Sequence, residues 1–123
     1  MLVALGGGLG SVARYLVSNW AFRAIGAVFP WGTLIVNVAG SFLLAIIMVL
    51  AVEGEIVSPR VRLALGTGLM GGFTTYSTFN YETMAMLSAG AWGFAGAYLV
   101  VTLAGCLVGG WLGMMGARLV VGG

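Results

Sequence analysis

Long apolar stretches separated by short polar segments dominate the pattern of hydrophobic and polar positions along this chain. A first stretch, residues 2 to 22, is interrupted only by Arg14. Three later windows contain no charged residue: 24–52, 63–81 and 83–117. A helix needs about 20 apolar residues to cross the hydrocarbon core of a bilayer. The last window is too long for one crossing and is divided by a loop signal, Ser88-Ala89-Gly90, so the pattern predicts four membrane-spanning helices.

Prolines and polar residues between the apolar stretches place the ends of these helices. Pro30 and Pro59 are the only prolines, and each precedes a predicted span, where a missing N–H is harmless. Ser58 before Pro59 has the residue types of a helix cap and first turn. We expect no cleaved leader, because the first charge comes only at Arg14. The prediction is one all-α integral membrane domain over 1–123, with spans at about 2–22, 32–52, 60–87 (broken near 71–78) and 92–118.

Composition agrees with a membrane protein and removes several classes of function. The chain is 61% hydrophobic and 7% charged, with a mean hydropathy of +1.12, which is far from the composition of a soluble domain. It has no histidine, and Glu53, Glu55 and Glu82 are not grouped as metal ligands, so we expect no enzyme. A net charge of +2 on five arginines is too sparse for a nucleic-acid surface. Cys106 is the single cysteine, which excludes an intramolecular disulfide.

The arginines differ little in number between the two ends of the predicted helices, with three at one end against one, or two if Arg14 reaches that way, at the other. With four spans, Arg60, Arg62 and Arg118 share one side of the membrane, and Arg23 lies on the other. The positive-inside rule orients such a chain only weakly. Insertion both ways up would permit an antiparallel homodimer with its two-fold axis in the membrane plane. Because four short helices enclose little space, a dimer is also the more natural way to build a pathway.

Small and polar residues recur at helical spacing. Glycines repeat every four residues at 6 and 10 and at 105, 109 and 113, which predicts close helix packing in lipid. Two polar stripes follow the i, i+4, i+8 spacing: Thr33, Asn37 and Ser41 in the second span, and Tyr98, Thr102 and Cys106 in the fourth. Either stripe alone is typical of hydrogen bonds between packed helices. The two together favour a polar track through the membrane.

Residues 71–80 interrupt a helical pattern with glycines and hydroxyls inside an uncharged window. Gly71 and Gly72 weaken the helix, and the following threonines and Ser77 can cap freed backbone groups. Irregular backbone at membrane depth survives only inside protein or beside water. Two interpretations stay open. One is a packed kink satisfied by its own side chains, and the other is an ion site, where freed carbonyls suit a cation and hydroxyl or N–H groups suit an anion.

The sequence Gly-Gly-Phe-Thr-Thr-Tyr-Ser-Thr-Phe at 71–79, preceded by Trp-Gly-Thr-Leu-Ile-Val-Asn at 31–37, resembles the Fluc fluoride channels, the CrcB family. The resemblance covers the whole chain, and its two motifs together are highly specific. It implies an antiparallel dual-topology homodimer in the lipid of a bacterial or archaeal cytoplasmic membrane. It further implies two pores that pass fluoride rather than chloride without an energy source, so that fluoride leaves the cell and its toxicity falls.

The resemblance also assigns roles to particular residues. The backbone carbonyls of Gly71 and Thr74 from both subunits are expected to hold a structural sodium ion (Na+) at the dimer centre. Phe79 matches one of the family's two pore phenylalanines, whereas Tyr76 departs from the other. Cys106 falls where a serine is familiar, so that end of the track is expected to be weaker or bypassed. The residues expected to line the pore or contact fluoride are Asn37, Tyr76, Ser77, Phe79, Tyr98, Thr102, Thr33, Arg14 and Glu82.

Alternatives remain for single residues and for the whole chain. Arg14 is expected either to reach the headgroups or to line an anion vestibule, and Glu82 either to pair with an arginine or to act in conduction. A small multidrug exporter also has four helices, but the resemblance to such a protein would require a carboxylate in the first helix as the basis of its site. This chain has Arg14 there instead. A structural or assembly protein would explain the glycines and the short loops, but it would not explain the polar stripes.

Overall fold

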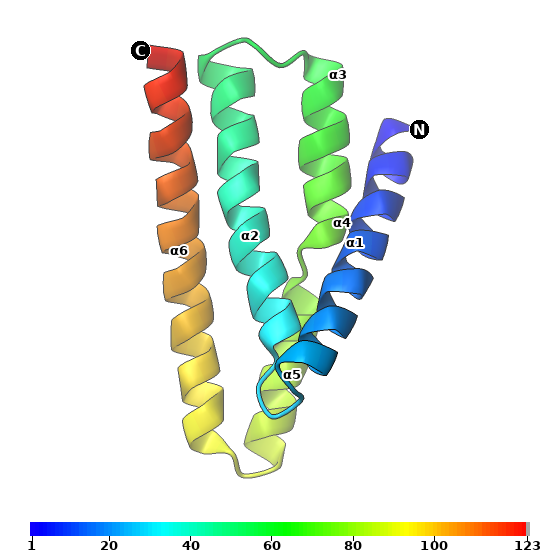
Figure 1. The fold of residues 1–123 in the computed structure, drawn as a ribbon, viewed down its shortest axis with the longest axis vertical. Helices are drawn as coiled ribbons and strands as arrows, with labels where there is room; N and C mark the ends of the chain where they lie inside the picture. Colours follow the sequence, from blue (N-terminus) through cyan, green and yellow to red (C-terminus); the bar gives the residue numbers. More distant parts are fainter. Residues whose placement is uncertain (123) are drawn as a thin grey trace.

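A computed structural model describes residues 1–122, so the last residue of the predicted domain, Gly123, lies outside the description. Every regular element of the described residues is a helix, which confirms the predicted all-α class. Figure 1 shows long helices lying side by side, joined by short connections at both ends. The elements are α1 (Leu2–Ala24), α2 (Trp31–Met48), η1 (Val49–Glu53), α3 (Pro59–Arg62), η2 (Leu63–Met70), α4 (Gly71–Phe73), α5 (Tyr76–Ser88) and α6 (Trp92–Gly122).

The helices form columns that run between two ends of the molecule. The wide π-helical turns of η1 extend α2, and those of η2 join α3 to α4 in one column. Both chain termini and the connection from η1 to α3 lie at the upper end in Figure 1, and the other two connections lie at the lower end. The helices Trp31–Glu53 and Trp92–Gly122 are long and apolar enough to cross a membrane. Four crossings stay a prediction.

α1 packs against η2 and α4 through glycines on both sides. Gly6 and Gly10 are buried, and a Cβ atom on Gly10 would meet the Leu69 carbonyl oxygen and lie 2.8 Å from the Phe73 nitrogen. A Cβ atom on Gly72 would likewise meet the Gly7 carbonyl oxygen. The backbones therefore approach so closely that only glycine fits, as small residues allow in membrane helices.

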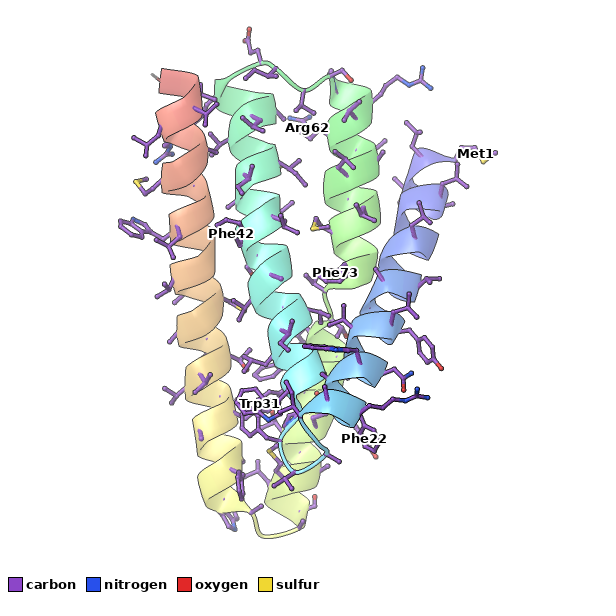
Figure 2. The ribbon with its side chains drawn as sticks, in the orientation of Figure 1. Met1, Phe22, Trp31, Phe42, Arg62 and Phe73 are labelled. Atoms are coloured by element: carbon purple, nitrogen blue, oxygen red, sulfur yellow. The ribbon has the colours of Figure 1, made fainter. Side chains whose placement is uncertain are left out.

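α2 packs along α6 through the glycine repeat of α6. A Cβ atom on Gly109 would lie 3.2 Å from the Val38 carbonyl oxygen, and one on Gly113 would meet the Phe42 carbonyl oxygen. Figure 2 shows Phe42 between these two helices. At the upper end, an exposed ion pair joins Arg118 of α6 to Glu53 of η1, with 2.7 Å between Nη2 and Oε1.

Most large apolar side chains point away from the small core. Only 22% of the apolar window in Trp31–Glu53 and 17% of that in Trp92–Gly122 are buried inside the chain. Leu9 on α1 and Leu107 on α6 are 67% and 75% exposed. Such a surface needs apolar surroundings, either lipid or another protein chain.

Candidate functional site: the interrupted helix and the clefts beside it

The helical column η2–α4 ends at Phe73, and a new helix, α5, begins at Tyr76. Figure 1 shows a short non-helical segment between α4 and α5, and Figure 2 labels Phe73 beside it. Thr74 and Thr75 have extended backbone, with ψ angles of 159° and 119°. The Thr75 hydroxyl caps α5 by accepting a hydrogen bond of 3.2 Å from the Thr78 N–H. We call Thr74 and Thr75 the break.

Asn37 of α2 holds the break through both sides of its amide. Its Nδ2 donates to the Thr75 carbonyl oxygen at 2.9 Å, and its Oδ1 accepts from the Thr75 N–H at 2.8 Å. This pairing resembles one rung of a β-ladder, with a side-chain amide in place of a second strand. Because extended backbone between helices has no regular partner, the amide replaces hydrogen bonds that would otherwise be missing.

Three further contacts stabilise the backbone around the break. The Arg14 Nε donates to the Gly72 carbonyl oxygen at 3.1 Å, which ties α1 to the last turn of α4. The Thr74 hydroxyl donates back to the Met70 carbonyl oxygen at 3.0 Å. Gly40 of α2 makes room for Thr74, because a Cβ atom there would meet the Thr74 methyl group.

A cleft of about 290 Å³ opens beside the break, between α2, α5 and α6. We call it the break cleft, and it is lined by Asn37, Gly40, Ser41, Leu44, Thr74, Thr75, Tyr76, Phe79, Thr102, Leu103 and Cys106. None of the lining side chains carries a charge. Thr102 is 4% exposed, and within residues 1–122 its Oγ1 is buried without a hydrogen-bond partner. The cleft therefore combines an apolar wall with neutral hydroxyl, amide and thiol groups.

An aromatic cluster closes one end of the break cleft. Tyr98 is completely buried, and its ring packs edge-on against Phe79 with 4.9 Å between the centroids. Tyr76 packs against the other side of Phe79 at 5.9 Å and is 76% exposed. Phe29, from the connection between α1 and α2, packs against Tyr98 at 5.3 Å. The edges of aromatic rings carry partial positive charge and can contact an electron-rich group.

A second cleft, of about 540 Å³, lies beyond the aromatic cluster toward the lower end in Figure 1. Its lining includes Thr33 of α2, Glu82 of α5 and the connection around Phe29. The Tyr98 hydroxyl donates to the Glu82 Oε1 at 2.9 Å, so one side chain reaches from the aromatic cluster to this cleft. We call this second space the end cleft.

Comparison with known proteins identifies the family of this chain. A family model described as "CrcB-like protein, Camphor Resistance (CrcB)" matches residues 1–114. The chain belongs to the CrcB family. The prediction that the chain resembles this family is therefore confirmed.

The similarity to curated members of the CrcB family extends over nearly the full chain. A protein of Anaeromyxobacter sp. (strain K), named "Fluoride-specific ion channel FluC", is 55% identical over 99% of this chain and 97% of its own length. Proteins with the same name from Sorangium cellulosum (strain So ce56) and Geobacter sulfurreducens (strain ATCC 51573 / DSM 12127 / PCA) are 49% and 45% identical. These two alignments cover 98% and 96% of this chain, respectively, and 95% of each relative. Their names are those of ion channels, in agreement with the prediction that the chain is not an enzyme.

The structure brings most of the site residues predicted from the CrcB resemblance into one continuous region. Asn37, Tyr76, Phe79 and Thr102 line the break cleft. Thr33 and Glu82 line the end cleft, and Tyr98 lies between the two groups through its ring and its hydroxyl. Ser77 and Arg14 line neither cleft: Ser77 is exposed, and Arg14 contacts the backbone of α4. Thr74 is part of the break, and Gly71 begins α4 three residues before it.

Thr75 and Phe29 are two residues with specific contacts in this region that were not among the predicted site residues. Thr75 pairs with Asn37 and caps α5, and threonine is one of the residue types that favour a helix N-cap. Phe29 joins the aromatic cluster from a connection between helices. No periodicity marks Phe29, because its position depends on how the chain turns between α1 and α2.

Proposed function

We propose that this chain is a passive, fluoride-selective ion channel. The observation that carries the proposal is the 55% identity, over 99% of the chain, to a protein named "Fluoride-specific ion channel FluC". The break cleft supports it, because neutral hydrogen-bond donors and aromatic rings are gathered there without a charged side chain. The channel is not an enzyme, and no reaction is assigned to its residues.

The chemistry of the break cleft suits a small, strongly hydrated anion. Fluoride must exchange its water for several short hydrogen bonds, and the Thr102 hydroxyl, buried without a partner within residues 1–122, is a donor available for that exchange. A fixed positive charge at the narrowest point would retain the ion and slow its exit. The Thr102 hydroxyl and the second N–H group of Asn37 are neutral donors, which hold an anion less tightly than a charged group would.

The proposal places the protein in the cytoplasmic membrane of a bacterium or archaeon, as an antiparallel homodimer with two pores. Both clefts are open on the surface of a single chain, and the outward apolar residues need lipid or a second copy against them. A membrane potential that is negative inside drives an anion outward with about 2.3 kcal/mol per charge per 100 mV. Passive efflux therefore lowers fluoride in the cell, which is how the channel would protect against fluoride.

We further propose a structural sodium ion bound by backbone carbonyls of Gly71 and Thr74. The regular helical donor for the Gly71 carbonyl would be the Thr75 N–H, and Asn37 accepts that hydrogen bond instead. Extended backbone at Thr74 likewise takes its carbonyl out of a helix. Carbonyl oxygens are ligands of hard cations, so these residues fit the ion. One chain supplies two such oxygens and a second copy would complete the set, which links the ion to assembly of the dimer.

Efflux from liposomes tests the proposed function. The purified protein is reconstituted in liposomes loaded with fluoride or chloride, and efflux is recorded with ion-selective electrodes after a potassium ionophore is added. We expect fast release of fluoride and retention of chloride. Retention of both ions by a folded protein would reject the channel and favour an assembly role or an exporter.

A further inference from the structure

Cys106, the single cysteine of the chain, lines the break cleft. It lies one helical turn after Thr102 on α6, so the two side chains share one face of that helix. Ser41 and Asn37 line the same cleft from α2. The thiol is therefore part of the wall of the proposed fluoride pathway, and it is half-buried there.

The unpartnered Thr102 hydroxyl is an independent sign that this cleft takes a ligand. Thr102 is 96% buried, and a buried hydroxyl without a protein partner needs a water molecule or an ion. A cleft of about 290 Å³ has room for several water molecules. Small ions that enter beside Thr102 come within one turn of the Cys106 thiol.

We propose that the break cleft is also a binding site for a soft, thiol-seeking metal cation such as Ag+, held by Cys106, and that this cation blocks fluoride passage. The proposal rests on the proposed function only for the block, because binding at the thiol is a separate property. Soft metal ions prefer sulfur ligands, and Cys106 supplies the one thiol. The Cys106 S–H bond breaks, an S–Ag bond forms and the proton leaves to water, with no change of oxidation state.

The surroundings of Cys106 favour entry of such a cation. No arginine lines the break cleft, so no positive side chain repels Ag+ from it. The hydroxyls of Ser41 and Thr102 can take the place of part of the water around the ion. A metal ion bound there would occupy the space that fluoride needs.

Fluoride efflux in the presence of Ag+ tests the block, with Cys106→Ser as the matched control. Serine keeps a polar group of similar size, and the control retains all seven methionines as weaker sulfur ligands. Liposomes are prepared in nitrate salts free of chloride, and micromolar silver nitrate is added before the ionophore. We expect loss of most fluoride efflux from the wild type and recovery after excess dithiothreitol. For Cys106→Ser we expect the same efflux rate with and without Ag+, whatever that variant's own rate is. Equal loss in both proteins, or no loss in the wild type, would overturn the block.

A chemical measurement separates this site from the channel function. The folded protein is treated with methyl methanethiosulfonate, whose sulfur the Cys106 thiolate attacks while methanesulfinate leaves, and the intact mass is recorded with and without prior Ag+. We expect the mass of one added methylthio group on the wild type, none on Cys106→Ser, and protection by Ag+. An unmodified wild type, or modification that Ag+ does not prevent, would reject the site even if fluoride efflux is normal. Absent fluoride efflux with this same protection would reject the proposed channel and keep the metal site.

Discussion

Asn37 has a structural task that its place in a polar stripe does not reveal. Its amide bonds both the N–H and the carbonyl of Thr75, which leaves one of its N–H groups for the break cleft. The side chain is 9% exposed, so both bonds lie largely out of contact with water. Asn37 therefore determines the shape of the break in addition to lining the cleft.

Replacing Asn37 by alanine is expected to destabilise the protein and stop fluoride efflux. The Asn37→Ala change leaves two backbone groups of Thr75 without their partners, which costs about 1–3 kcal/mol for each group that stays buried. Thermal unfolding in detergent measures the stability, and the liposome assay measures efflux. Ser41→Ala, one turn along the same face, is the control, since Ser41 makes no side-chain hydrogen bond within residues 1–122. Equal unfolding temperatures for the two variants would contradict this role of Asn37.

The Tyr98 hydroxyl joins the two clefts, and its removal tests whether that link matters for conduction. Tyr98→Phe keeps the ring against Phe79 and loses the hydrogen bond to Glu82. We expect a stability loss of about 1 kcal/mol, because one hydrogen bond is removed without a cavity, together with slower fluoride efflux. Glu82→Gln keeps an oxygen acceptor for Tyr98 and serves as the comparison. Unchanged efflux in Tyr98→Phe would remove the hydroxyl from the proposed pathway.

At the element scale, glycine residues determine how closely neighbouring helices can approach one another. A Cβ atom on Gly10 would collide with the backbone of η2 and α4, whereas one on Gly8, two residues earlier in α1, would have nothing within 4 Å. The two positions lie in the same helix and differ only in the face they occupy. They form a matched pair for measuring the packing of α1.

Gly10→Ala is expected to destabilise the protein and Gly8→Ala to stabilise it slightly. Overpacking at Gly10 costs about 1–3 kcal/mol, and alanine gains about 0.5–1 kcal/mol over glycine in a helix. Thermal unfolding of both variants in the same detergent checks the difference, and size-exclusion chromatography checks that each is folded. A similar shift for both would mean that α1 does not pack on η2 as described.

At the element scale, the sequence predicted which segments are helical better than it predicted where those helices are interrupted or irregular. Apolar periodicity is repeated over many residues, so the helical class follows from it and is confirmed. The non-helical part of the interruption is Thr74 and Thr75, narrower than the predicted 71–78, because Gly71, Gly72 and Phe73 continue the helix. The π-helical turns at η1 and η2 carry no comparable signal, since they depend on local packing rather than on residue period.

At the scale of the whole molecule, a single copy of the chain leaves many large apolar side chains uncovered. Its large apolar side chains point outward along α1 and α6, and its two clefts are open on its surface. The upper end carries Arg60, Arg62 and Arg118, while Arg23 lies at the lower end of α1. This weak charge difference is the physical basis for expecting both orientations in the membrane.

Labelling from one side of the membrane tests the dual topology. Ser88→Cys, in the Cys106→Ser background, places one thiol at the exposed last residue of α5, beside the lower connection. If the homodimer is antiparallel, an impermeant maleimide added to spheroplasts of expressing cells reaches about half of the copies, because each dimer presents one copy of this end outward. Permeabilised spheroplasts give the total. Labelling of nearly all or nearly none without permeabilisation would show a single orientation and reject the antiparallel dimer.

The sequence by itself determined the helical class and the stripe that carries Tyr98 and Thr102, because both depend on residues close together in the chain. It also determined the family, through residue types that recur along nearly the whole chain. The tertiary structure alone decided that Asn37 pairs with Thr75, 38 residues away, and that Arg14 donates to the Gly72 carbonyl, 58 residues away. It also placed Cys106 beside the buried Thr102 hydroxyl in a cleft. Spacing along a helix states which side chains share a face, but only the packing of helices against one another states what that face meets.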